Sequence, residues 1–79
     1  MNITVRGYLG FEIYTNCLPG NENLVIKADS RIKDVLDLIM IPKELRSAMA
    51  IFINGRLTET ESLLKEQDKV VFYPMMEGG

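Results

Sequence analysis

The residues that could take part in chemistry gather at the C-terminal end of the sequence. The chain ends in the stretch PMMEGG, residues 74–79, in which Gly78 and Gly79 come last. Glycine has no Cβ, so a chain that ends in two glycines can enter a narrow site and bring its backbone close to a reacting group. The alternative is that this is a fraying chain end that carries glycine by chance.

The rest of the sequence lacks the residues of common catalytic centres. It contains no histidine and a single cysteine, Cys17. The lack of histidine excludes Ser-His and Cys-His pairs, and a single cysteine excludes an intrachain disulfide and a multi-cysteine metal site. Cys17 lies in a Pro-Gly loop without an activating neighbour, so we expect it to be incidental. We therefore expect a chain that is not an enzyme by itself and that binds neither a metal nor a cofactor.

Length and composition limit the class of protein further. A chain of 79 residues with 47% hydrophobic residues predicts one domain with a modest core. The net charge of −2 argues against a nucleic-acid partner, which usually selects a basic surface. The apolar runs are too short to span a membrane, and the N-terminus MNITVRG does not have the pattern of a signal peptide. These features predict a cytoplasmic protein.

Alternating hydrophobicity predicts strands in the first third of the chain. Ile3 and Val5 alternate with polar residues and predict a strand within residues 1–9. The stretch FEIY, residues 11–14, alternates again and indicates a returning second strand. Residues 15–23 contain Pro19-Gly20 and two asparagines, which is typical of a turn. Residues 24–28, LVIKA, predict a further strand.

The hydrophobic period then changes to that of a helix. Asp29 and Ser30 are the predicted N-cap candidates, and Pro42 prevents the helix from continuing unbroken. The stretch PKEL that begins at Pro42 is expected to form a further short turn. Asp34 and Asp37 are interpreted, with Asp29, as cap and solvent-facing residues and not as metal ligands. The predicted buried face of the helix consists of Ile32, Val35, Leu36 and Ile39.

The last third of the sequence again predicts strands. The stretch AMAIFI, residues 48–53, is continuously apolar and predicts a central strand. Asn54-Gly55 is the preferred two-residue hairpin turn, and RLT begins the returning strand. Residues 69–74, KVVFYP, predict the last strand, and Pro74 is expected to end its pairing. The whole order predicts an α+β domain with a mixed sheet of four or five strands and one main helix across one face.

Four apolar side chains are expected on the opposite, open face of this sheet. If Val70 and Phe72 point toward the helix, then Tyr73 points away from it, because strand side chains alternate. An aromatic patch on an open face indicates an association surface. The alternative is that these side chains cover a second small core or pack on the first loop. The candidates are Tyr8, Phe52, Leu57 and Tyr73.

The sequence resembles the ubiquitin-like sulfur-carrier family, which includes the small subunit of molybdopterin synthase and the sulfur carrier of thiamine thiazole synthesis. The matching segments are Ile53-Asn54-Gly55, Gln67-Asp68-Lys69-Val70 and the end of the chain from Phe72 to Gly79. The resemblance covers roughly residues 24–79. It implies the ubiquitin-like β-grasp fold, with a domain in residues 1–74 and a flexible Gly-Gly tail in residues 75–79.

Two segments favour different branches of that family. Residues 10–23, GFEIYTNCLPGNEN, show no helical period, and a direct hairpin there resembles the thiamine type. Phe72-x-Pro74 and the chain length resemble the molybdopterin type, which we favour. The branch stays open at this point.

The resemblance implies a chemistry for the chain end. An E1-like adenylating enzyme would use ATP to activate the carboxylate of Gly79, and sulfur would then replace AMP to give a thiocarboxylate. Gly78 and Gly79 would be the reacting end, while Pro74, Met75, Met76 and Glu77 would be the tail residues that lie in the partner's channel. Met75 and Met76 could instead rest on the domain, although flexible thioethers suit an adaptable channel contact.

The resemblance also implies the partners and the alternative functions. The acceptor would be the large subunit of molybdopterin synthase or thiazole synthase, with neither nucleic acid nor membrane involved. The same tail would serve a ubiquitin-like modifier that is joined to lysines of target proteins. A non-covalent β-grasp interaction domain with an inert tail is the remaining alternative.

Overall fold

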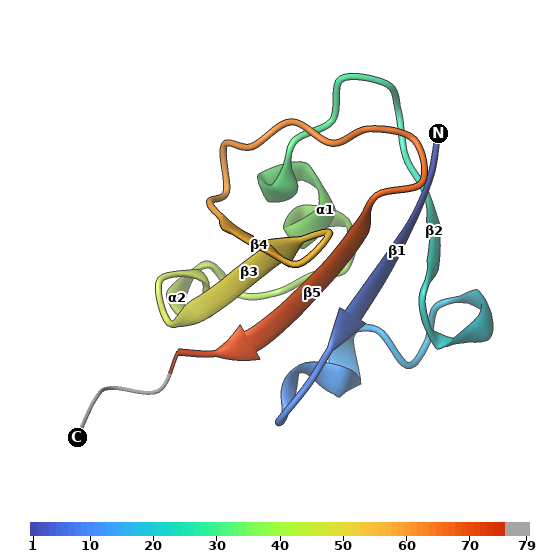
Figure 1. The fold of residues 1–79 in the computed structure, drawn as a ribbon. Coiled ribbons are helices and arrows are strands. Elements are labelled where there is room, and N and C mark those ends of the chain that lie inside the picture. The colour runs from blue at the N-terminus through green and yellow to red at the C-terminus, as the bar shows by residue number, and fades with distance from the viewer. Residues whose placement is uncertain (76–79) are drawn as a thin grey trace.

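The structure is a computed structural model that describes residues 1–75 of the 79-residue chain. The elements form one mixed sheet with a helix behind it (Figure 1). Along the chain they are β1 (Asn2–Gly7), the 3-10 helices η1 (Phe11–Tyr14) and η2 (Pro19–Asn21), β2 (Asn23–Val25), α1 (Ile32–Leu38), α2 (Lys43–Arg46), β3 (Met49–Ile53), β4 (Arg56–Thr58) and β5 (Lys69–Pro74).

The sheet has five strands in the order β2-β1-β5-β3-β4. The two central strands, β1 and β5, are parallel, and every other pairing is antiparallel. This arrangement confirms the predicted mixed sheet and the β-grasp fold. The last strand of the chain lies in the middle of the sheet, so both of its edges are hydrogen-bonded. The C-terminal end of the described chain is therefore held by the most fully paired strand.

The core lies between one face of the sheet and α1. The predicted helix face is confirmed, because Ile32, Val35 and Leu36 are fully buried and Ile39 nearly so. The strands contribute every second residue to the same core, as a half-buried sheet requires. Among residues 1–75 no helix combines the length and apolarity needed to cross a lipid bilayer. The strand residues of the core are Ile3, Val5, Met49, Ile51, Val70 and Phe72.

The predicted hairpin after residue 53 is confirmed. Asn54 and Gly55 both have positive φ angles, of 51° and 84°, which the tight two-residue turn requires. The register places Ile53 opposite Arg56, so the turn contains only these two residues. The short helix α2 begins directly after Pro42, also as expected.

The predicted second strand in residues 11–14 is wrong. These residues form η1, in which Phe11 alone is buried and Ile13 is 70% exposed. The chain turns sharply before this helix, since Leu9 and Gly10 have φ angles of 55° and 110°. The turn seats Phe11 directly against Gly7 of β1. The alternation of apolar and polar residues in this stretch therefore does not reflect a strand. Only Phe11 is buried, and it anchors a 3-10 turn.

The predicted direct hairpin in residues 10–23 is also wrong. The connection contains η1 and η2, and the antiparallel partner of β1 is β2. β2 covers Asn23–Val25, which is shorter than the strand predicted over residues 24–28, and β1 ends at Gly7 rather than residue 9. Short 3-10 turns carry no 3.6-residue period, so no helical pattern is present in these residues. The segment no longer argues for the thiamine type.

The predicted N-caps of α1 are one or two residues too early. The N-cap is Arg31, whose extended backbone forms an isolated bridge with Leu63. The carboxylate of Asp34 accepts a hydrogen bond from the Arg31 backbone N–H at 2.8 Å. The Ser30 hydroxyl instead donates to the carbonyl of Lys27 at 2.7 Å. The bridge to a distant segment fixes the start of the helix, and such a contact is invisible in the local sequence.

Candidate functional site

The site begins where β5 leaves the sheet. Pro74 is opposite Met49 in the register and is the last residue of the strand. The backbone N–H of Met75 still donates to the carbonyl of Ala48 at 2.7 Å, and the Met75 side chain is 55% exposed. Hydrogen bonding therefore continues one residue beyond the predicted end of pairing at Pro74. The division into a domain in residues 1–74 and a tail in residues 75–79 stays a prediction.

A polar network fixes the other end of β5. The amide of Asn54 donates to Asp68 Oδ1 at 2.9 Å, and the backbone N–H of Lys69 donates to Asn54 Oδ1 at 2.9 Å. The second oxygen of Asp68 accepts the backbone N–H of Lys65 at 2.8 Å. Asp68 is only 8% exposed, so these bonds satisfy a buried carboxylate. Asn54 and Asp68 belong to the family-like segments of the sequence, and the network shows that they position the strand carrying the chain end.

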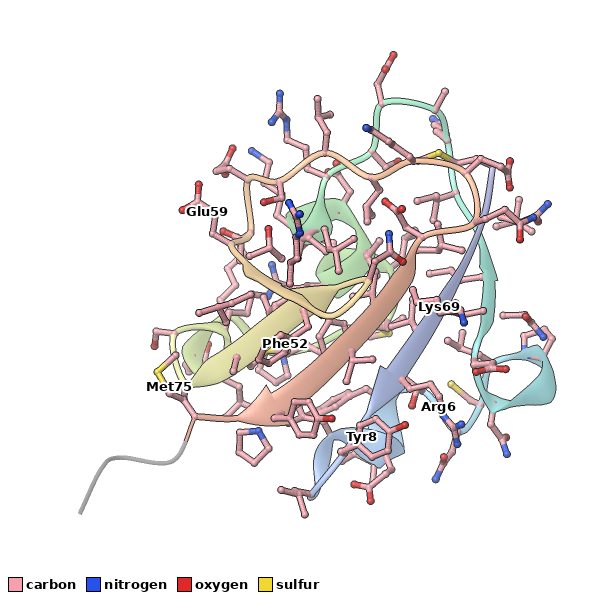
Figure 2. All side chains as sticks on the ribbon, viewed as in Figure 1. Arg6, Tyr8, Phe52, Glu59, Lys69 and Met75 are labelled. Atoms are coloured by element: carbon pink, nitrogen blue, oxygen red, sulfur yellow. The ribbon has the colours of Figure 1, made fainter. Side chains whose placement is uncertain are left out.

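Three aromatic side chains come together on the open face, which is the face of the sheet opposite α1. The rings of Tyr8 and Tyr73 are stacked with a centroid separation of 5.3 Å and an interplanar angle of 16°. Phe52 meets Tyr73 edge-on at 5.7 Å. Figure 2 shows Tyr8 and Phe52 on the side of the sheet turned toward the viewer, with α1 behind it. The predicted orientation of these side chains is confirmed, and we refer to Tyr8, Phe52 and Tyr73 as the aromatic cluster.

The fourth predicted residue, Leu57, lies beside the aromatic cluster on the edge strand β4. It is opposite Phe52 in the register and is 69% exposed. Because directly opposed residues share a face, Leu57 extends the apolar surface to the edge of the sheet. A shallow hollow of about 290 Å³ is lined by Phe52, Gly55, Val71 and Tyr73. The partner-facing role of this surface stays a prediction.

Sequence reasoning missed two members of the open face. Val71 is opposite Phe52 in the register and lines the hollow. The alternation of the last strand places it on the same face as Tyr73, but it was not among the site candidates. Arg6 also belongs to this face, because its guanidinium carbon lies 5.8 Å from the centre of the Tyr8 ring. This distance is that of a cation–π contact, and Glu22 lies 4.0 Å from the same guanidinium.

The loop after Tyr8 is held by the carboxylate of Glu12. Hydrogen bonds from the backbone N–H groups of Glu12 itself and of Gly10 lower the pKa of this carboxyl below its ordinary value. The backbone N–H of Tyr8 donates to the carbonyl of Phe72 at 3.0 Å. These bonds fix the position from which the Tyr8 ring reaches Tyr73.

The other predicted site residues, Met76, Glu77, Gly78 and Gly79, lie outside the described residues. Within the described part of the chain, no three histidine, cysteine, aspartate or glutamate side chains come close enough to hold a metal ion. Cys17 is exposed and free. Its thiol has one long contact, 4.0 Å from the carbonyl of Tyr14.

Comparison with solved structures identifies several proteins of the same fold. SAMP1 from Haloferax volcanii superposes with a TM-score of 0.72 at 14% identity, and each chain is covered completely. A putative molybdopterin converting factor subunit 1 from Pyrococcus furiosus gives 0.73 at 18% identity, with 96% of this chain and 99% of that chain covered. Subunits 1 and 2 of the molybdopterin-converting factor from Helicobacter pylori form a solved complex; the matched chain gives 0.61 at 25% identity with complete coverage of both chains.

Comparison with curated proteins found no match. A family model, in contrast, matches residues 11–79. This range includes Phe52 and Tyr73 of the aromatic cluster and the last residues of the sequence. The strand order, the central position of β5 and this match agree with one another. The chain therefore belongs to the ThiS family and is a member of the ubiquitin-like sulfur carriers.

Proposed function

We propose that this protein carries sulfur as a thiocarboxylate at Gly79 and delivers it to a partner enzyme in cofactor biosynthesis. The observation that carries the proposal is the family match, which extends through residue 79 and thus includes both glycines. The position of β5 supports it, because the strand that precedes the last residues of the sequence is hydrogen-bonded on both edges.

The chemistry needs two steps at one carbon atom. A carboxylate oxygen of Gly79 attacks the α-phosphorus of ATP in an E1-like adenylating enzyme, and pyrophosphate leaves. A hydrosulfide equivalent supplied by a sulfur donor then attacks the carbonyl carbon of the acyl adenylate, and AMP leaves with the electron pair of the broken C–O bond. The product is a thiocarboxylate, and ATP belongs to the partner. Glycine at the last two positions leaves room for a close backbone approach in both steps.

The length of the chain end determines which surface the partner must cover. Four residues follow Met75 and span at most about 14 Å when extended. An enzyme that acts on Gly79 must therefore approach within that distance of Met75. The aromatic cluster lies beside the end of β5 and would be covered by the same partner. This supports an interface built from Tyr8, Phe52, Tyr73 and Leu57.

We favour the molybdopterin type of acceptor. The likeness to the molybdopterin converting factor subunits from P. furiosus and H. pylori supports it, and the H. pylori complex of subunits 1 and 2 supports a large subunit as the partner. The Phe72-x-Pro74 segment agrees with this choice. Thiazole synthase is the alternative acceptor, because the ThiS family includes the carrier that the sequence also resembles.

Protein modification is a second candidate function. It is supported by the likeness to two structures from H. volcanii, SAMP1 and small archaeal modifier protein 1, the latter with a TM-score of 0.75 at 10% identity. The modifier and the carrier share the adenylation step and differ in the nucleophile that displaces AMP, which would be a lysine amine of a target protein. Conjugates of higher mass would distinguish the modifier.

The first experiment is intact-mass spectrometry of the full chain after incubation with an E1-like adenylating enzyme, ATP, Mg²⁺ and sulfide. We expect a mass gain equal to exchange of one oxygen for one sulfur, located in the C-terminal fragment. A variant that lacks Gly79 should show no gain. Cys17→Ser is the matched control and should keep the full gain, because it removes the exposed thiol whose oxidation to a sulfenic acid would add nearly the same mass.

Two results would contradict the carrier. One is an unchanged mass of the complete chain, and the other is a gain that disappears in Cys17→Ser. If the gain is found, the thiocarboxylated protein is offered to the large subunit of molybdopterin synthase or to thiazole synthase, each with its precursor. The acceptor that returns the carrier to its original mass identifies the pathway.

A further inference from the structure

A second surface lies at the edge of the sheet formed by β2. Ile26 exchanges two hydrogen bonds with Met1, at 2.6 and 2.9 Å, so its backbone groups point into the sheet. Because successive residues of a strand alternate, the N–H and C=O of Val25 point away from β1. Asn2, which is opposite Val25 in the register, uses its own N–H and C=O for Glu66 and Gln67. Val25 therefore offers a donor and an acceptor at the open edge.

Hollows border this edge on both sides of the sheet. The hollow on the helix side has a volume of about 800 Å³ and lies between β2, the chain that follows it and the residues Asp34, Asp37 and Leu38 of α1. The other hollow has a volume of about 630 Å³ and is lined by the first residues of β1, by β2 and by Pro19 and Lys69. Side chains of an added strand would alternate between the two faces, so both hollows would receive them.

Apolar surface is exposed at the same place. Val25 is 74% exposed and lines both hollows, and Leu38 is 59% exposed and lines the helix-side hollow. The open part of the edge is short, since the carbonyl of Lys27 is already occupied by Ser30. An incoming strand would therefore form its hydrogen bonds around Val25.

The charged side chains beside the β2 edge determine which sequence of added strand would bind best. Three aspartates and one lysine line the helix-side hollow. Asp37 is ion-paired with Arg46 at 2.8 Å, and the carboxylate of Asp34 accepts a hydrogen bond from a backbone N–H. Asp29 is exposed and has no ion pair among the described residues. The excess negative charge favours a lysine or arginine on that side of the added strand.

Two other occupants fit less well. A second copy paired through β2 in antiparallel fashion would place both acidic hollows on one face of the joined sheet, where the aspartates would repel one another. Residues 76–79 of the chain contain Glu77 and no basic side chain, so their charge has the wrong sign. We propose that the β2 edge binds an extended, basic–apolar segment of a partner protein by strand addition, at a site separate from the aromatic cluster and the chain end.

The test uses the full ¹⁵N-labelled chain and a synthetic probe. The probe is an acetylated and amidated peptide of about six residues in which lysine and valine alternate. We expect amide shifts centred on Val25 and Lys27, with the amides of Tyr8, Phe52 and Tyr73 unchanged. The same peptide with alternate amides N-methylated should lose binding, because it cannot form the ladder. A peptide with glutamate in place of lysine should bind more weakly.

Matched variants examine the edge and the charge separately. Val25→Lys should weaken binding at least about tenfold, since it removes apolar surface that the added strand would bury and brings a positive charge next to the basic peptide. Leu57→Lys places the same change on β4, the other edge strand, and should leave binding unchanged. Asp29→Asn should weaken binding about two- to fivefold, whereas Glu44→Gln removes an equal charge from α2 without effect.

Several outcomes would overturn the proposal. These are the absence of binding, equal binding of the N-methylated or glutamate peptide, and shifts confined to the aromatic cluster. Shifts of Val25 and Lys27 that grow with protein concentration without peptide would identify a second copy as the occupant instead. None of these results depends on Gly79, so the sulfur-carrier proposal is tested independently.

Discussion

At Gly7 the chain passes so close to η1 that a side chain has no room. A Cβ built on this residue would lie 2.2 Å from the carbonyl oxygen and 2.7 Å from the Cβ of Phe11. Both groups belong to an anchored segment, since Phe11 is buried in the core and the N–H of Gly7 donates to the Thr15 hydroxyl at 3.2 Å. The requirement for glycine here arises from close approach and not from an unusual φ angle.

Gly7→Ala should therefore lower the free energy of unfolding by about 3 kcal/mol or more, because the backbone of Phe11 must move. The measurement is urea denaturation followed by circular dichroism. Gly55→Ala is the comparison: its φ is 84°, but no atom lies within 4 Å of the added Cβ, so the cost should be only about 1–2 kcal/mol. Equal losses for the two variants would contradict the close-packing argument.

At the scale of elements, the hairpin turn and the start of β5 act as one unit. Asn54 bridges them with its side chain, and its backbone N–H donates to the carbonyl of Lys69 at 2.8 Å. Asp68 completes the unit by accepting from both Asn54 and Lys65. The position of β5 in the middle of the sheet is thus fixed at its first residue by side chains as well as by the ladder.

Asp68→Ala should reduce the free energy of unfolding by about 1–3 kcal/mol, because it leaves two donors of part-buried hydrogen bonds, the Asn54 amide and the Lys65 backbone N–H, without their acceptor. Denaturant titration measures the loss. Glu59→Ala, which changes an exposed carboxylate, should stay within about 0.5 kcal/mol of the natural protein. If Asp68→Ala were as mild as Glu59→Ala, the network would not be what holds β5.

At the scale of the whole molecule, one face of the sheet forms the core and the other is the proposed binding surface. One face packs on α1, and the other displays the aromatic cluster, with Leu57 opposite Phe52 in the register. Figure 2 shows Tyr8 and Phe52 on this second face. Residues that build the fold and residues proposed to meet a partner are therefore different side chains of the same strands. A substitution on the open face can be expected to alter binding without altering the core.

Leu57→Ser tests this separation. Affinity for the proposed large-subunit partner should fall about tenfold, because the complex would lose part of the apolar area that Leu57 buries against the partner. The free energy of unfolding should change little, because Leu57 is exposed in the free protein. Isothermal titration calorimetry and denaturation provide the two readouts. Leu38→Ser, an exposed leucine of α1 behind the sheet, is the control and should keep the affinity. A stability loss that matches the affinity loss would place Leu57 in the fold and not in the interface.

The strongly periodic segments could be predicted from the sequence. The buried face of α1 needs only the 3.6-residue spacing of Ile32, Val35, Leu36 and Ile39, and β5 needs only the alternation from Val70 to Tyr73. Asn54-Gly55 specifies its turn because both residues adopt positive φ. These are local properties, since neighbours along the chain decide them.

Tertiary structure alone decided the remaining features. The stretch FEIY became η1 because Phe11 anchors against Gly7, and Arg31 became the N-cap because its backbone pairs with Leu63. The stack of Tyr8 on Tyr73 and the open β2 edge depend on which strands are neighbours, and no local pattern encodes that choice. By itself the sequence determined the periods, the turns and the two glycines at the end of the chain. The fold decided which side chains meet, because contacts between distant segments depend on strand order and packing.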